Sequence, residues 1–218
     1  SFTYTDGGIL TLATTSDASV GGADNIDAGD GNNLILGGFG NDVIISGQGR
    51  DLIAGDNADL LFTNGRVTSL TTTDASETTG GADTIDAGDG DNIVLGGVGA
   101  DAITGGSGND FILGDNGRFT LTAAGVLTYA TTADVTLGGD DTITAGAGNN
   151  VILGGSGSDT ITTLDGADII LGDNGSFTYT DGGILTLATT SDASVGGADK
   201  IDAGAGDNYI QIGRASCR

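Results

Sequence analysis

Acidic and amide side chains recur every nine residues through most of this chain, beginning at Asp24, Asn33, Asp42 and Asp51. The same spacing returns further along at Asp83, Asn92, Asp101, Asp110, Asp141, Asn150, Asp159, Asp168, Asp199 and Asn208. Carboxylate and amide oxygens in this pattern suit hard divalent cations. Because an active site needs one group unlike its neighbours, the repetition favours a series of metal sites over catalysis, and we expect no enzyme activity within these residues.

The composition excludes several kinds of binding partner and of metal site. The 218 residues include 30 acids, all Asp except Glu77, against 6 basic residues, giving a net charge of −24. Such a charge argues against binding to nucleic acid or to an anionic membrane surface. With no His and one Cys, imidazole and thiolate sites are excluded, so any metal must be held by oxygen. No uninterrupted apolar stretch is long enough for membrane insertion.

Longer repeats set the organisation of the chain. Residues 1–24 recur without change at residues 176–199, and two diverged copies lie between them. The tripeptide GDN begins at Gly55, Gly114 and Gly172, so one module spans 58 or 59 residues. Within each module the nine-residue unit occurs four times in succession. A turn followed by a short strand fits this period better than a helix does.

Four stretches fit the pattern G-G-x-G-x-D-x-U-x, where U is a large aliphatic residue: residues 37–45, 96–104, 105–113 and 154–162. The glycines at the second and fourth positions are Gly38, Gly40, Gly97, Gly99, Gly106, Gly108, Gly155 and Gly157. We expect glycine to supply positive φ angles in a loop whose carbonyl oxygens converge on a metal. The three residues x-U-x then form a strand that points one aliphatic side chain inward.

This motif resembles the RTX (repeats-in-toxin) family of haemolysin-type calcium-binding repeats, and the resemblance covers about three fifths of the chain. It implies an all-β fold, the parallel β-roll, in which two nonapeptides make one turn and calcium lies between loops one turn apart. Loops on one edge are then 18 residues apart, which stacks Asp24 on Asp42, Asp83 on Asp101 and Asp141 on Asp159.

Stacked carboxylates explain why a cation is needed. Two of them about 5 Å apart repel by roughly 1 to 3 kcal/mol at effective dielectric constants between 80 and 20. Ca²⁺ accepts six to eight oxygens in tolerant geometry, whereas Mg²⁺ requires a tight octahedron, so several Ca²⁺ ions per chain are the expected cofactors. We therefore expect folding and calcium binding to be one event.

Two groups of candidate ligands have alternative interpretations. On the opposite edge Asn33, Asn92 and Asn150 stack over Asp51, Asp110 and Asp168, and there Asn either completes a weaker calcium site or simply ends a turn. The GDN tripeptides place Asp56, Asp115 and Asp173 at the end of each roll module, where they either cap the last site or act as ordinary turn residues.

The stretches between the roll modules alternate apolar residues with Thr around a Gly-containing turn, which predicts β-hairpins that interrupt or cap each roll. We expect hairpin inserts at residues 1–20, 58–79, 117–137 and 175–195. We expect β-roll modules at residues 21–57, 80–116 and 138–174, with a fourth beginning at 196–211. Residues 212–218 break the period and resemble a translated sequencing adapter, so we expect a non-native tail; the alternative is a divergent terminus with a free thiol.

Three functions fit these features. The first is a structural calcium-binding repeat of a large bacterial adhesin or matrix protein, whose cell-surface partner the sequence does not name. The second is the secretion and folding module of an extracellular enzyme whose catalytic domain lies elsewhere. The third is a ligand- or ice-binding surface on the Thr-rich hairpins. Extracellular modules bind calcium at about 10⁻⁴ to 10⁻³ M, which predicts folding outside the cell. The family resemblance implies export by a type I secretion system.

Overall fold

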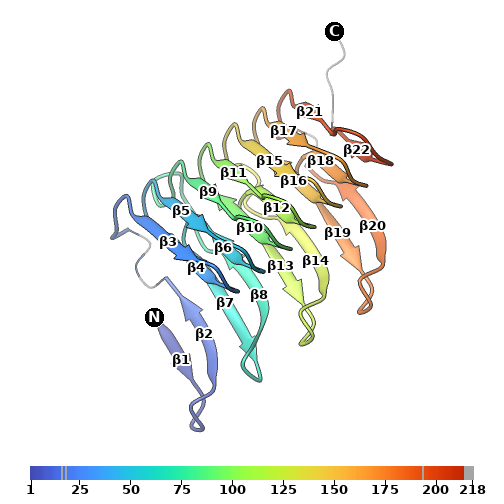
Figure 1. Cartoon of the computed structure of the whole chain (residues 1–218). Coiled ribbons are helices and arrows are strands. Elements are labelled where there is room, and N and C mark those ends of the chain that lie inside the picture. Colours follow the sequence, from blue (N-terminus) through green and yellow to red (C-terminus); the bar gives the residue numbers. More distant parts are fainter. Residues whose placement is uncertain (16, 18, 193, 214–218) are drawn as a thin grey trace.

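The computed structural model describes residues 1–15, 17, 19–192 and 194–213, which form three β-sheets (Figure 1). None of these residues belongs to a helix that is long and apolar enough to cross a membrane. Two of the sheets are parallel and make up a roll, and the third consists of antiparallel hairpins. The expected all-β fold with a parallel β-roll is confirmed.

The two sheets of the roll each have seven strands, which alternate along the sequence. The outer roll sheet contains β3 (Asn25–Gly29), β5 (Val43–Ser46), β9 (Thr84–Asp86), β11 (Ala102–Thr104), β15 (Thr142–Gly146), β17 (Thr160–Thr163) and β21 (Lys200–Asp202). The middle roll sheet contains β4 (Leu34–Leu36), β6 (Leu52–Ala54), β10 (Ile93–Gly97), β12 (Phe111–Asp115), β16 (Val151–Gly155), β18 (Ile169–Asp173) and β22 (Tyr209–Gln211).

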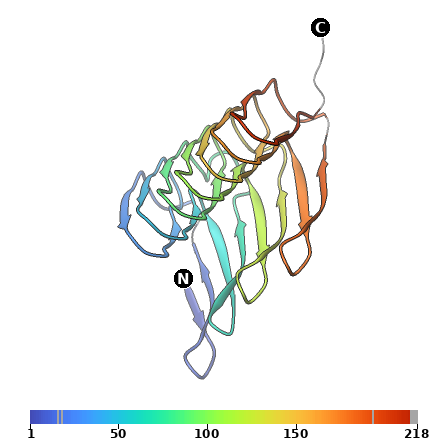
Figure 2. The ribbon, with the colours of Figure 1, turned by 45° about the vertical axis from the view of Figure 1, so that its right-hand side comes forward.

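The hairpin sheet has eight strands in the order of the sequence. Its members are β1 (Phe2–Tyr4), β2 (Leu10–Thr14), β7 (Ala58–Thr63), β8 (Arg66–Thr72), β13 (Gly117–Leu121), β14 (Leu127–Thr132), β19 (Gly175–Tyr179) and β20 (Leu185–Thr190). The hairpins lie side by side along one flank of the roll, as Figure 2 shows, and pair with one another, with Ala130 opposite Phe177 for example.

The roll continues across the hairpins. Strand β5 pairs with β9 in parallel, with Ile44 opposite Ile85, although a hairpin lies between them in the sequence. Within one module β3 pairs with β5 in the same way, with Ile26 opposite Ile44. The hairpins therefore interrupt the sequence of the roll without interrupting its sheets.

Two apolar layers hold the three sheets together. Between the two roll sheets lies the column of single aliphatic side chains that the nine-residue period predicts, including Ile44, Ile103 and Ile112, which are at most 1% exposed. Between the middle roll sheet and the hairpins lies a second layer that includes Leu113 and Phe119. Because the middle sheet is covered on both faces, its strands are apolar at nearly every position, as buried parallel strands generally are.

Candidate metal centres

The loops of the roll form two edges, and the candidate ligands form one column on each edge. The loops of the first edge, here the Asp edge, lead into the outer roll sheet and end at Asp24, Asp42, Asp83, Asp101, Asp141, Asp159 and Asp199. The loops of the second edge, here the mixed edge, lead into the middle roll sheet and end at Asn33, Asp51, Asn92, Asp110, Asn150, Asp168 and Asn208. Both columns continue from one module to the next.

From Asp42 onward, each Asp of the Asp edge accepts a hydrogen bond from the preceding loop through one carboxylate oxygen. The backbone N–H of Asp83 donates to Oδ1 of Asp101 at 2.8 Å, and that of Asp101 donates to Oδ1 of Asp141 at 2.8 Å. Equivalent bonds join Asp24 to Asp42, Asp42 to Asp83, Asp141 to Asp159 and Asp159 to Asp199, at 2.7 to 3.1 Å. Hydrogen bonds from backbone N–H groups to carboxylates thus hold the acidic loops in a stack.

The second carboxylate oxygen in this column has no partner in the protein. Oδ2 is buried and lacks a hydrogen bond in Asp42, Asp83, Asp101, Asp141, Asp159 and Asp199. Leaving a buried acceptor unsatisfied costs about 1 to 3 kcal/mol, and more for a charged group. Six such atoms in one column therefore point to a positively charged ligand that the column is built to receive.

Backbone carbonyl oxygens complete the surroundings of these carboxylates. A Cβ atom placed on Gly37 would lie 2.6 Å from Oδ2 of Asp42 and would also touch the carbonyl oxygen of Gly55. The same pairing joins Oδ2 of Asp101 to the carbonyl oxygen of Gly114 around Gly96. At these first-position glycines one carboxylate oxygen and one carbonyl oxygen thus converge, too close to leave room for any side chain, and such a donor set fits a hard cation such as Ca²⁺.

Burial and mutual repulsion alter the acidity of this column. Desolvation, together with a smaller contribution from the neighbouring acids Asp42 and Asp199, raises the pKa of Asp83 and of Asp159 to about 7. Burial likewise raises the pKa of Asp101 and Asp141 well above the ordinary value of 3.8. The backbone N–H donors oppose these shifts. The ionised column is therefore electrostatically unfavourable without a compensating cation.

Side chains supply few of the ligands that an ion would need. Among the described residues no three His, Cys, Asp or Glu side chains gather into a metal-binding cluster, so an ion must take several ligands from carbonyl oxygens. The eight second- and fourth-position glycines singled out in the sequence have φ between +78° and +142°, as predicted. Sequence reasoning did not single out the carbonyl oxygens of Gly55, Gly114 and Gly172, each of which opens a GDN tripeptide at the point where a hairpin departs.

The acids of the GDN tripeptides lie on the Asp edge and are engaged mainly with backbone N–H groups. Asp115 is 1% exposed and accepts hydrogen bonds from the N–H of Gly139, at 3.0 Å, and of Ser156. Asp173 accepts from Gly197 at 3.1 Å. Asp56 accepts through Oδ2 from Val98 at 2.6 Å, while its Oδ1 is unpartnered, and burial raises its pKa to about 10. These contacts tie each departing hairpin to the next loops of the roll.

The mixed edge has the same series of hydrogen bonds from backbone N–H groups to side-chain oxygens, but Asn alternates with Asp as the acceptor. The N–H of Asn92 donates to Oδ1 of Asp110 at 2.9 Å, and the N–H of Asp110 donates to Oδ1 of Asn150 at 3.1 Å. Equivalent bonds join Asn33, Asp51, Asn92 and, further along, Asn150, Asp168 and Asn208. The predicted stacks of Asn on Asp are therefore present on this edge.

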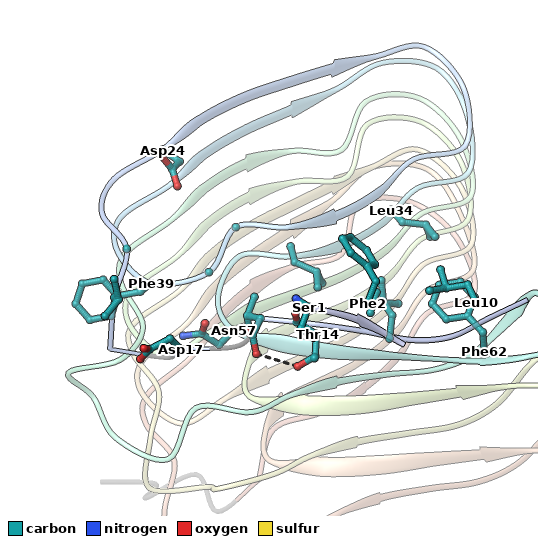
Figure 3. Close-up of a pocket in the computed structure, with 18 residues that line it drawn as sticks. Ser1, Phe2, Leu10, Thr14, Asp17, Asp24, Leu34, Phe39, Asn57 and Phe62 are labelled. Atoms are coloured by element: carbon teal, nitrogen blue, oxygen red, sulfur yellow. Dashed lines mark hydrogen bonds between the residues drawn. The ribbon is translucent and has the colours of Figure 1, made fainter. Parts of the chain in front are cut away.

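A hollow of about 580 Å³ lies beside the first hairpin (Figure 3). Phe2, Leu10 and Phe62 line its apolar side, and Asp24 and Phe39 lie toward the first loops. In the identical repeat Phe177, the counterpart of Phe2, is fully buried against the preceding hairpin. The hollow thus adjoins a Phe that stays exposed in this copy of the repeat, and we assign no ligand to it.

Of the predicted tail, residues 214–218 lie outside the described residues, and with them the single Cys, Cys217.

Comparison with known proteins identifies the repeats. The family model that describes the RTX calcium-binding nonapeptide repeat (4 copies) matches the chain over residues 20–53, 77–112, 135–170, 148–176 and 195–211, of which the third and fourth ranges overlap. Together these ranges cover more than half of the 218 residues. No curated protein and no solved structure matches the chain.

Proposed function

Because the chain belongs to the RTX calcium-binding nonapeptide repeat family, we propose that it is a structural segment of an extracellular adhesin or matrix-type protein that folds and stiffens on binding Ca²⁺. The observation that supports this best is the column of six buried, unpartnered carboxylate oxygens on the Asp edge. Repeats of this family are structural, and we propose that these residues carry no catalytic activity of their own.

The Asp edge would hold the ions. The carboxylates of Asp42, Asp83, Asp101, Asp141, Asp159 and Asp199 would provide the charged ligands, with Asp24 at the exposed end of the column. The carbonyl oxygens of Gly55, Gly96, Gly114, Gly154 and Gly172 lie close to these carboxylates and would provide neutral ligands. Bound Ca²⁺ supplies the positive charge that converts repulsion between stacked loops into attraction. We assign Asp56, Asp115 and Asp173 to fixing the departing hairpins.

We also propose that the protein is exported before it folds. Extracellular calcium modules bind at about 10⁻⁴ to 10⁻³ M, so such a roll stays unfolded in the cytosol and folds where calcium is plentiful. This behaviour fits export by a type I secretion system. The continuous roll, covered on one flank by the hairpin sheet, supports a role in setting the length and stiffness of the parent protein. The alternative, a folding module attached to a secreted enzyme, rests on the same repeats, and no contact in the described chain favours it.

The test is a calcium titration of the whole chain followed by circular dichroism and small-angle scattering. We expect an expanded chain in excess chelator and a compact rod with β-structure in millimolar Ca²⁺, with much less effect of Mg²⁺ at the same concentration. Full β-structure in chelator, or a chain that stays expanded in calcium, would rule the proposal out.

A further inference from the structure

The asparagines of the mixed edge point donors at loop carbonyl oxygens. Nδ2 of Asn33 donates to the carbonyl oxygens of Gly29 and Gly31 at 3.0 and 3.2 Å. Nδ2 of Asn150 likewise donates to its own loop, to Gly146 at 3.4 Å and Gly148 at 3.2 Å.

Two further asparagines show the same behaviour. Nδ2 of Asn92 donates to Gly88 at 3.1 Å and to Gly105 at 3.3 Å, and Nδ2 of Asn208 donates to Ala203 at 2.8 Å. An amide N–H₂ group is therefore placed where convergent carbonyl oxygens would otherwise require a cation.

Hydroxyl groups satisfy two of the three mixed-edge carboxylates. Ser46 Oγ donates to Oδ2 of Asp51 at 2.7 Å, and Thr163 Oγ1 donates to Oδ2 of Asp168 at 2.7 Å. Both hydroxyls come from the residue five positions before the Asp, which is the first position of the nonapeptide. On the Asp edge the regular loops have glycine there, at Gly37, Gly96 and Gly154, and their Asp residues keep an unpartnered oxygen.

Asp110 departs from its two counterparts on the mixed edge. The residue five positions before it is Gly105, which brings no hydroxyl, and Oδ2 of Asp110 is buried without a partner in a side chain that is 0% exposed. A Cβ atom on Gly105 would lie 2.6 Å from this Oδ2 and 3.2 Å from the carbonyl oxygen of Ala145. This convergence of one carboxylate and one carbonyl oxygen repeats the arrangement of the Asp edge.

We propose, building on the proposed function, that the two edges differ in their need for calcium. Along the described mixed edge, Asn amides and the Ser46 and Thr163 hydroxyls take the place of ions, and Asp110 alone keeps a buried carboxylate oxygen for one. The Asp edge depends on calcium throughout. The roll is thus a scaffold with one calcium-dependent edge and one edge held largely by its own hydrogen bonds.

The number of Ca²⁺ ions bound by the whole chain, measured by equilibrium dialysis with radioactive calcium, tests this. Asp110→Asn should bind one ion fewer than the unmodified chain, while Asp51→Asn and Asp168→Asn should bind the same number. Asp101→Asn, on the Asp edge, should lose at least one ion, and Asp181→Asn, an exposed acid at a hairpin tip, should lose none.

Exchanging the first-position residues gives a reciprocal test that keeps every carboxylate. Gly105→Ser should supply the missing hydroxyl and remove one ion, whereas Thr163→Gly should free Oδ2 of Asp168 and add one. Circular dichroism in calcium identifies variants that remain folded.

Failure of the proposed function and failure of the difference between the two edges would give different results. An unmodified chain that binds no calcium would defeat the proposed function itself. An unmodified chain that binds calcium but loses an ion in Asp51→Asn, or keeps all ions in both Asp110→Asn and Gly105→Ser, would overturn only the difference between the edges.

Discussion

The backbone N–H of Asp42 donates a 2.7 Å hydrogen bond to Oδ1 of Asp83, although a complete hairpin separates the two residues along the chain. The contact from Asp83 to Asp101, only 18 residues apart, has the same form and a length of 2.8 Å. The ladder of acidic loops is therefore insensitive to the insertions. Because each loop holds its neighbour, the binding of an ion at one level should favour order in the levels beside it.

Removing one charge from the Asp edge should change stability in opposite directions with and without calcium. Asp101→Asn keeps an Oδ1 acceptor for the N–H of Asp83 but loses the buried charge. In calcium we expect at least tenfold weaker binding, equivalent to about 1.4 kcal/mol or more. In chelator we expect the variant to be more stable, since a desolvated carboxylate is gone. The urea midpoint in calcium and the residual β-structure in chelator, by circular dichroism, measure this.

Asp181→Asn serves as the control, because it removes the same charge from an exposed hairpin tip. It should change neither the urea midpoint in calcium nor the residual β-structure in chelator appreciably. If Asp101→Asn destabilised the chain equally in calcium and in chelator, the carboxylate would be acting as a structural hydrogen-bond acceptor only.

Protons should partly substitute for calcium. Burial raises the folded-state pKa of Asp83 to about 7, of Asp110 to about 8 and of Asp56 to about 10, against 3.8 ordinarily. The folded chain thus binds protons more tightly than the unfolded one. This contribution to stability is complete below about pH 3.8 and is lost as the pH rises through 7 to 10.

Circular dichroism of the chain in chelator should therefore show more β-structure as the pH falls from 9 toward 5. In the same range the calcium midpoint should move to higher concentration, because protons and ions compete for the same oxygens. A calcium-free chain that loses structure on acidification from pH 9 to 5 would contradict the raised pKa values.

The nine-residue period was sufficient to predict the roll, because it fixes both the turn of glycines and the inward aliphatic residue, such as Ile44 or Ile103. The period did not predict which face of the roll the hairpins cover. The signal was present in the strands: residues 111–113 are Phe-Ile-Leu, apolar on both faces, whereas residues 84–86 are Thr-Ile-Asp. Only a sheet covered on both sides requires the first pattern.

The chemistry of the mixed edge was harder to predict than its position. An asparagine carries both a carbonyl oxygen and an amide N–H₂ group, so its presence in a ligand column is compatible with binding a cation or with replacing one. The orientation of Asn33 toward the carbonyl oxygens of Gly29 and Gly31 decides between these, and it depends on the loop backbone. Likewise, Ser46 becomes important only because the fold places it against Asp51.

A side chain at the fourth loop position should be poorly tolerated where loops stack. Gly148 has φ of +136°, and a Cβ atom there would collide with the carbonyl oxygen of Gly108 in the adjoining loop. Gly148→Ala should therefore cost at least about 1 to 3 kcal/mol through backbone strain, beyond the steric clash. Gly22→Ala is the matched control, since a Cβ atom there has no neighbour within 4 Å. Thermal melts in saturating calcium should separate the two, and equal losses would contradict the close stacking of the loops.

The exact repeat offers a comparison of one side chain in two surroundings. Phe2 and Phe177 occupy the same place in identical 24-residue sequences, yet Phe2 is 67% exposed and Phe177 is 0% exposed, opposite Ala130 of the preceding hairpin. Phe177→Ala should cost about 3 to 5 kcal/mol, as for other buried aromatic residues. Phe2→Ala should cost less than about 1 kcal/mol, because most of its surface already lies in water.

Hydrogen exchange in saturating calcium measures this locally. In Phe177→Ala the amides of β14 and β19 should lose protection, while those of the first two modules keep it, because stability in a stacked array is transmitted mainly between neighbours. In Phe2→Ala exchange should change at most in β1 and β2. Equal effects of the two substitutions would show that the hairpin sheet does not pack on the roll as the structure describes.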